Sequence, residues 1–155
     1  MKNISQDLTI AECAYLAGLV DGEGCINFYR TKSKSCSKGY TFVARLAISN
    51  SDVETLIELR ERLGMGNVIK KPKQLGNRKD GYNLCLHARA VRQLLPLILP
   101  YLRIKKKQAE IVLGFLNRQR WGGWKRGLTQ QEHDLREIES SALGKLNQRG
   151  IFNKL

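Results

Sequence analysis

The stretch "AYLAGLVDGEGCINFYR", residues 14–30, decides the fold, because a small-residue segment with helical spacing passes directly into an alternating one. A capping box formed by Thr9 and Glu12 predicts a helix that runs to about Asp21. The helix thus ends in two acids, Asp21 and Glu23, although the negative pole of a helix dipole disfavours acids. A local rule broken in a chain of net charge +13 indicates a functional spot that a cation completes.

The composition is that of a basic globular chain. Of its 155 residues 42% are hydrophobic, and 27 Lys and Arg stand against 14 Asp and Glu, for a pI of 9.9. This length suits a single domain over residues 1–155, with a core over residues 9–120 and a C-terminal helical extension over residues 121–155. The basic surplus favours a polyanionic partner, either nucleic acid or an anionic membrane.

Several classes of protein are disfavoured by the sequence. No stretch approaches the roughly 20 apolar residues of a membrane span, and the N-terminus lacks the apolar core of a signal peptide. The four cysteines contain no CxxC pair, and neither histidine stands at zinc-like spacing from them. We therefore expect reduced thiols in an intracellular protein, cytoplasmic or organellar, without membrane contact.

Two hairpins are predicted between the helices. In "YTFVARLAIS", residues 40–49, apolar side chains from Phe42 to Ile48 alternate with a second set that includes Arg45. Residues 24–31 alternate in the same way before a turn rich in Lys, Ser and Gly, and residues 66–87 repeat the scheme around "QLGNRKDG".

Further helices complete the order. Ser51 with Glu54 is interpreted as a second capping box, for a helix that stops at Gly64, and Thr129 with Glu132 as a third. Two more helices fit residues 88–100, with a kink at Pro96, and residues 104–119. The predicted fold class is α+β, in the order αββαββα, with an antiparallel sheet as a saddle and C-terminal helices.

The basic charge is concentrated in the two hairpins. One face of the sheet should pack on helices, and the other should present Asn, Tyr, Thr, Arg and Lys. A positive ribbon of this kind suits the major groove of DNA, whereas the alternative is a solvated sheet face with ordinary lysines.

One stripe of the first helix consists of Ala11, Ala14, Gly18 and Asp21. Ala14 and Gly18 form a small-xxx-small pair, which lets another backbone come close, although simple core packing is the alternative. The acids and carbonyls that follow are hard oxygen ligands, suited to Mg²⁺ or Ca²⁺.

The segment "LAGLVDGEG", residues 16–24, resembles the signature of the LAGLIDADG homing endonucleases, and "LPYLRIKKKQAEIVLGFL", residues 99–116, resembles their downstream basic segment. A single copy of the motif resembles the branch that works as a homodimer through this helix. The resemblance implies a site-specific endonuclease that makes an Mg²⁺-dependent double-strand break in a long pseudo-palindromic DNA target, as in intron or intein homing. Ca²⁺ would support binding without cleavage.

The resemblance also implies roles for single residues. Glu23 corresponds to the metal-binding acid, where the family most often has Asp, and the carbonyl of Gly22 would be a second ligand. Asp21 corresponds to a residue that stabilises the paired motif helices. Asn50 aligns with a polar residue that orders water, often Gln in this branch.

Lys105 matches the basic residue near the scissile phosphate, with Lys106 and Lys107 as competitors. The catalytic set predicted by the resemblance is therefore Glu23, Asn50 and Lys105.

The hairpins supply the predicted DNA contacts. A strand of about ten residues spans about 33 Å, or about 10 bp, so two subunits would read about 20 bp. Outward side chains expected to read bases are Asn27, Tyr29, Thr31, Thr41, Arg45, Lys71 and Asn83. Those in or near turns, expected to contact phosphates, are Lys32, Lys34, Lys38, Lys73, Arg78 and Lys79.

Two other functions fit the same residues. One is an RNA-binding intron maturase, and the other is a DNA-binding protein of this fold that does not cleave. Charge alone does not separate DNA from RNA.

Overall fold

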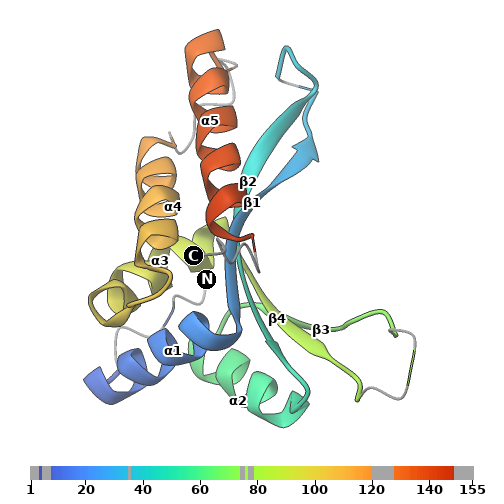
Figure 1. Ribbon diagram of the computed structural model, residues 1–155, viewed down its shortest axis with the longest axis vertical. Coiled ribbons are helices and arrows are strands. Elements are labelled where there is room, and N and C mark those ends of the chain that lie inside the picture. Colours follow the sequence, from blue (N-terminus) through green and yellow to red (C-terminus); the bar gives the residue numbers. More distant parts are fainter. Residues whose placement is uncertain are drawn as a thin grey trace, which may run out of the picture.

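The computed structural model describes residues 4, 8–34, 36–73, 76, 79–119 and 128–148. The elements follow the predicted order (Figure 1). They are α1 (Ile10–Glu23), β1 (Gly24–Lys32), β2 (Tyr40–Asn50), α2 (Val53–Leu63), β3 (Asn67–Lys70), β4 (Tyr82–His87), α3 (Ala88–Ile98), the 3-10 helix η1 (Leu99–Tyr101), α4 (Lys106–Arg118) and α5 (Gln130–Leu146).

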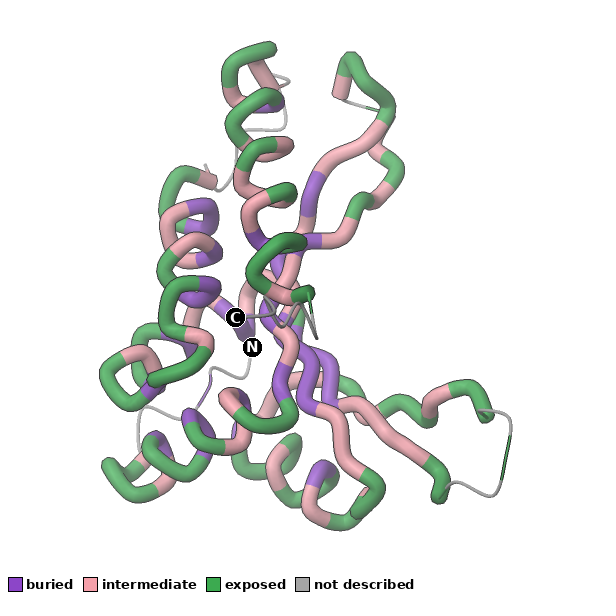
Figure 2. Tube along the Cα trace, in the orientation of Figure 1, coloured by how far each residue is buried: buried purple, intermediate pink, exposed green. Residues whose placement is uncertain are grey.

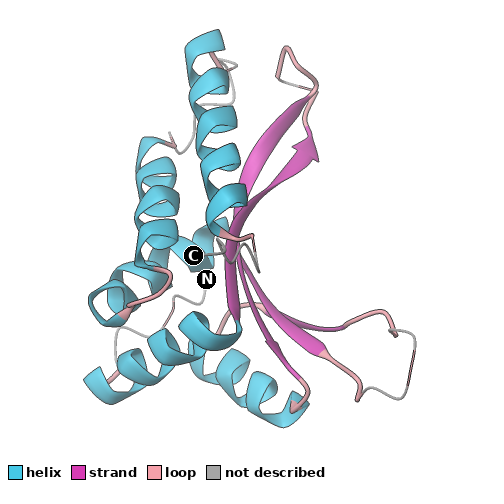
Figure 3. Cartoon of the chain, viewed as in Figure 1, coloured by secondary structure: helices cyan, strands magenta, loops and turns pink. Residues whose placement is uncertain are grey.

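The four strands form one antiparallel sheet in the order β1-β2-β4-β3. Helices α1, α3, α4 and α5 lie along one side of this sheet, and its opposite side carries no described helix (Figure 3). The predicted αββαββα fold with an open sheet face is therefore confirmed. None of the helices in the described ranges is long and apolar enough to cross a membrane.

The strand register sorts the side chains onto two faces. Directly opposed residues share a face, so the pairs Gly24–Ile48 and Ile26–Leu46 put one set against the helices. The helix-facing residues are buried as far along the hairpin as Phe28 in β1 and Phe42 in β2. The alternate residues of β1 are partly exposed (Figure 2). The predicted alternation holds, and the core lies between the sheet and the helices.

Two of the three predicted capping boxes are present. The Thr9 hydroxyl accepts the N–H of Glu12, and Thr129 does the same for Glu132. The box assigned to Ser51 was wrong, because Asp52 is the N-cap of α2 and its carboxylate accepts the Thr55 hydroxyl at 2.6 Å.

Several element ends differ slightly from the expected ones. Helix α1 continues to Glu23, so both acids lie in its last turn. Gly24 begins β1 immediately, and a Cβ there would lie 2.5 Å from the Val20 carbonyl oxygen, so the tight exit needs glycine. Helix α3 contains Pro96 and gives way to η1 after Ile98.

Candidate catalytic edge and DNA-binding face

Asp21 joins the end of α1 to the start of α4. Its carboxylate accepts the backbone N–H of Arg103 at 2.8 Å and that of Lys105 at 2.9 Å. Partial burial opposes its ionisation, but these hydrogen bonds outweigh burial and hold the pKa of Asp21 below its usual value. The carboxylate thus lies at the positive N-terminal end of α4, which offsets its unfavourable place in α1.

Lys105 makes the reciprocal contact. Its ammonium donates to the carbonyl oxygen of Val20 at 3.0 Å and to that of Asp21. These are carbonyls of the last turn of α1, where a cation is favoured by the helix dipole. Lys105 therefore secures the end of α1 and lies beside the motif acids, while its predicted contact with a phosphate stays a prediction.

Glu23 differs from Asp21 in having no hydrogen bond or ion pair with the described residues, and its side chain is exposed. It is the last residue of α1, and Gly24 starts the strand that crosses the sheet. Its carboxylate is thus a free negative charge at the edge of a basic surface.

The residues at this edge fit Mg²⁺. The cation prefers oxygen donors and is commonly bound by one or two carboxylates together with substrate phosphates. Glu23 and the exposed Gly22 supply a carboxylate and a carbonyl, and no cluster of three His, Cys, Asp or Glu side chains occurs in the described ranges. One chain would therefore supply a part of the ligand shell.

Asn50 is placed at the same edge but on the covered face. The register pairs Gly24 with Ile48, so Asn50 lies two residues past that pair, near the end of α1. Its side-chain oxygen accepts the N–H of Asp52 at 3.0 Å, which ties it to the start of α2. Its predicted role in ordering water stays a prediction.

The predicted small-residue stripe of α1 faces outward. Ala11, Ala14 and Gly18 are exposed, whereas Leu16, Ala17 and Val20 face the core. A groove of about 580 Å³ runs beside Ala14, Gly18 and Asp21, and its other wall is the segment from Pro100 to Lys106. The alternative of simple core packing for Ala14 and Gly18 was therefore wrong.

The open face of the sheet carries a polar row across three strands. Asn27 lies opposite Arg45, and Arg45 lies opposite His87. The Asn27 Oδ1 and Arg45 Nε atoms are buried and have no hydrogen-bond partner among the residues that the structure describes. Tyr29 extends the row, with its hydroxyl 3.5 Å from His87 Nδ1. Buried polar atoms are usually hydrogen-bonded, so this row has hydrogen-bonding capacity to spare.

His87 was not among the predicted site residues. The signal was present, because Leu84 and Leu86 point into the core and the alternate residues of β4 therefore share the open face with Asn83. Asn83 accepts the Ser49 hydroxyl at 2.7 Å, which fixes the orientation of its amide.

The remaining predicted DNA contacts fall into three groups. Exposed and near the hairpin turns are Lys32, Lys34, Lys73 and Lys79, while Thr31 and Lys71 are half-buried. Thr41 and Lys38 instead contact α5, through Arg136 at 3.1 Å and Asp134 at 3.5 Å. Arg78 lies outside the described residues.

The fold and the site combine an open antiparallel sheet face with an exposed acid at the end of the first helix. A sequence model described as LAGLIDADG endonuclease matches residues 16–115. The DNA endonuclease I-CvuI from Chlorella vulgaris is 30% identical over 109 residues, which are 68% of this chain and 63% of that protein. The chain therefore belongs to the LAGLIDADG endonuclease family. The match spans less than two thirds of the length of I-CvuI.

Solved structures show the same fold. The crystal structure of I-CvuI with DNA and Mg²⁺ superposes with a TM-score of 0.71 at 22% identity, covering 94% of this chain and 87% of that one. The archaeal intron-encoded homing endonuclease I-Vdi141I in complex with DNA has a TM-score of 0.70 at 17% identity, covering 90% and 86%.

Proposed function

We propose that this protein is a site-specific DNA endonuclease that makes Mg²⁺-dependent double-strand breaks as a homodimer. The carrying observation is the Glu23 carboxylate, which pairs with none of the described residues and lies at the end of α1 where the uncovered sheet face begins. Family membership supports the same activity, as does the 30% identity to the DNA endonuclease I-CvuI.

Each part of the chain has a distinct task in this mechanism. The sheet face binds the duplex, and the pair Asn27 and Arg45 reads base edges in the major groove. The bonds between Asp21, Lys105 and the end of α1 hold Glu23 at a fixed position. Glu23 and the Gly22 carbonyl would hold Mg²⁺, which would supply positive charge to the phosphate under attack. The ammonium of Lys105 lies at the carbonyl oxygens of Val20 and Asp21 and contributes positive charge to the same edge.

The exposed side of α1 supports the homodimer. Its open stripe is joined by two large apolar side chains, Ile10 and Tyr15, which are 74% and 55% exposed. Apolar surface of this kind marks an interaction site. A second copy seated on it would bring two Glu23 side chains together, and two symmetric sites would cut both strands.

The test starts from a library of randomised 24-bp duplexes, because the chain does not reveal its target. Wild-type protein is incubated with the library in Ca²⁺, bound duplexes are sequenced, and the enriched site is cloned into a supercoiled plasmid. We expect a pseudo-palindromic site, linear plasmid in Mg²⁺, and binding without cleavage in Ca²⁺.

The rival functions give other results. A protein that enriches a site but leaves the plasmid supercoiled in Mg²⁺ would be a DNA-binding protein without cleavage. A protein that enriches no duplex and instead binds structured RNA would be a maturase. Either result would overturn the proposal.

A further inference from the structure

Helix α5 lies beyond the family match at residues 16–115 and has no task in the mechanism above. It packs along α4 and β1, next to the hairpin formed by β1 and β2 (Figure 1). Hydrogen bonds and ion pairs connect α5 to this hairpin along its length.

The hairpin needs external support along its outer half. Strand β4 pairs with β2 only over Arg45–Asn50, so residues 40–44 of β2 pair with β1 alone. A two-stranded ribbon by itself is marginally stable in water. Tyr29, Thr31 and Thr41 belong to this outer half, so any DNA contact they make depends on what holds the ribbon.

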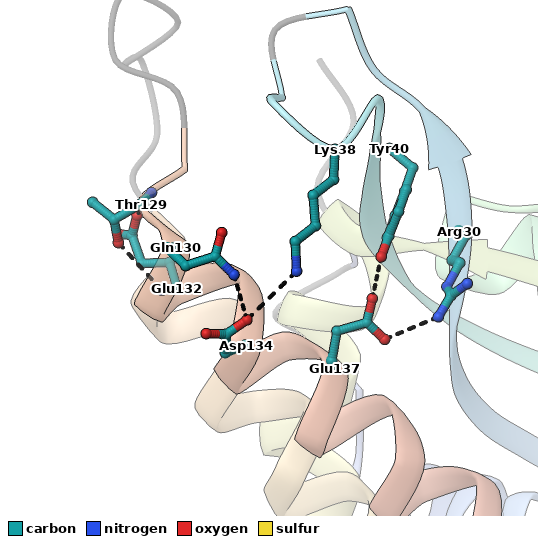
Figure 4. A network of polar contacts seen from close by, with 8 residues as sticks. All are labelled: Arg30, Lys38, Tyr40, Thr129, Gln130, Glu132, Asp134 and Glu137. Carbon is teal, nitrogen blue, oxygen red and sulfur yellow. Dashed lines mark hydrogen bonds and ion pairs between the residues drawn. The ribbon is translucent and has the colours of Figure 1, made fainter.

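Glu137 of α5 contacts both strands of the hairpin in its outer half. Its carboxylate accepts a hydrogen bond from Arg30 Nη2 at 2.9 Å and another from the Tyr40 hydroxyl (Figure 4). The Arg30 guanidinium also stacks over the Tyr40 ring, 4.9 Å from its centroid. These bonds, that from Tyr40 foremost, hold the pKa of Glu137 below its usual value, so the carboxylate is charged at neutral pH.

Other residues extend the contact towards both ends of the ribbon. Asp134 accepts Lys38 at 3.5 Å near the turn, and Arg136 donates to the Thr41 hydroxyl. At the root, Asn147 donates to the carbonyl oxygen of Ile26 at 2.8 Å. Acids of α5 therefore form ion pairs with two bases of the first hairpin, Arg30 and Lys38.

We propose that α5 is a brace that sets the position of the outer half of the first hairpin, and that Glu137 is a positioning residue that determines specificity at the outer base pairs. The inference rests on the proposed DNA-binding function.

The braced residues should read a definite part of the target. Tyr29 and Thr31 lie five and seven residues beyond Gly24, about 16–23 Å along the strand at about 3.3 Å per residue. At about 3.4 Å per base pair, they reach positions about 5–7 bp from the centre of the target.

The test compares Glu137→Gln, Arg30→Gln and the wild type on the randomised duplex library. Glu110→Gln is the control matched to Glu137→Gln. Glu110 is exposed on α4, and its replacement changes the net charge by the same amount as Glu137→Gln. Both variants should lose roughly fivefold to tenfold discrimination at 5–7 bp from the centre and keep it at the inner positions. The control should match the wild type.

Salt dependence separates a positional effect from a change in the number of phosphate contacts. Arg30 lies on the helix-facing side of the hairpin, so both Glu137→Gln and Arg30→Gln should keep the wild-type logarithmic salt slope. General destabilisation would lower discrimination at all positions alike.

Two results would overturn the brace. One is a wild-type protein that enriches a site while Glu137→Gln and Arg30→Gln give the same profile as the control. The other is an equal loss of discrimination at inner and outer positions. A wild-type protein that enriches no duplex would refute the DNA-binding function itself, and the brace with it.

Discussion

The two ends of α1 each carry an acid, and the two acids differ in their hydrogen-bond partners. At the N-terminal end, Glu12 accepts hydrogen bonds from Arg62 and from the backbone and hydroxyl of Thr9. The Arg62 contact is the main reason that the pKa of Glu12 falls to about 2. At the other end, Glu23 has no such partner in the described residues. A carboxylate whose oxygens accept hydrogen bonds within the fold stabilises the fold. A carboxylate without such bonds is available to bind a metal ion.

Asp21 lies between these two cases. It is two residues from Glu23, yet its carboxylate is used by the N–H groups that precede α4. Proximity to the motif therefore does not by itself make an acid part of the site. The distinction is made by what each carboxylate contacts.

The largest structural effect is expected between the two ends, at Gly18. A Cβ at this position meets nothing within 4 Å in the single chain, so Gly18→Leu should leave the fold of one subunit intact. In a dimer the leucine would separate the two helices, so we expect monomers and loss of cleavage. Sedimentation velocity measures the oligomeric state.

The control for this prediction is Gly144→Leu, at another helical glycine with open space around it. It should keep the wild-type sedimentation coefficient. A Gly18→Leu protein that still sediments as a dimer would show that α1 is not the interface.

Glu12→Gln should destabilise the fold without touching the chemistry. The variant weakens the capping box of α1 and the ion pair with Arg62, so the free energy of unfolding should be lower than that of the wild type. Urea denaturation measures it, with Glu58→Gln on the exposed side of α2 as the control. Unchanged stability would mean that the hydrogen bonds of Glu12 do not stabilise the fold.

Asp21→Asn should cost less, about 1 kcal/mol, because an amide oxygen can still accept one of the two backbone N–H groups. The same urea titration measures it. Because Asp21 positions the end of α1 and does not itself react, the variant should still linearise the plasmid below its unfolding midpoint, whereas complete loss of cleavage in a fully folded protein would place Asp21 in the chemistry.

The smallest effect is in the pH dependence of Glu12. Its folded pKa is depressed from 4.5 to about 2, so its stabilising contribution is complete above 4.5 and is lost as the pH falls towards 2. The difference in melting temperature between wild type and Glu12→Gln should be constant from pH 7 to 5. Below pH 5 the difference should shrink as Glu12 of the wild type becomes protonated. A difference that persists at pH 2 would contradict this assignment.

Local features of the fold were predictable from the sequence. The capping boxes at Thr9 and Thr129 and the alternation in β2 depend on residues a few positions apart, so the pattern reveals them. The box at Ser51 failed because its neighbour Asp52 is an equally good cap, and the pattern alone does not choose between adjacent candidates.

Contacts between distant residues were not predictable in this way. Lys105 reaches a carbonyl 85 residues away, and Glu137 contacts Arg30 across 107 residues. Which helix face meets which strand is decided by packing of the whole core. The resemblance could place Lys105 near the motif but could not show that it also caps α1.

The central claim is that the Glu23 carboxylate takes part in DNA cleavage and is not needed for the fold, and the cleavage rate of Glu23→Gln tests it most directly. The variant and Glu12→Gln are assayed on the enriched plasmid site in Mg²⁺, at a temperature where both are folded by circular dichroism. The account predicts that Glu23→Gln keeps the wild-type melting temperature and linearises plasmid at least about 100-fold more slowly, while Glu12→Gln melts earlier and cuts normally. A folded Glu23→Gln protein that still makes double-strand breaks at the wild-type rate would contradict it.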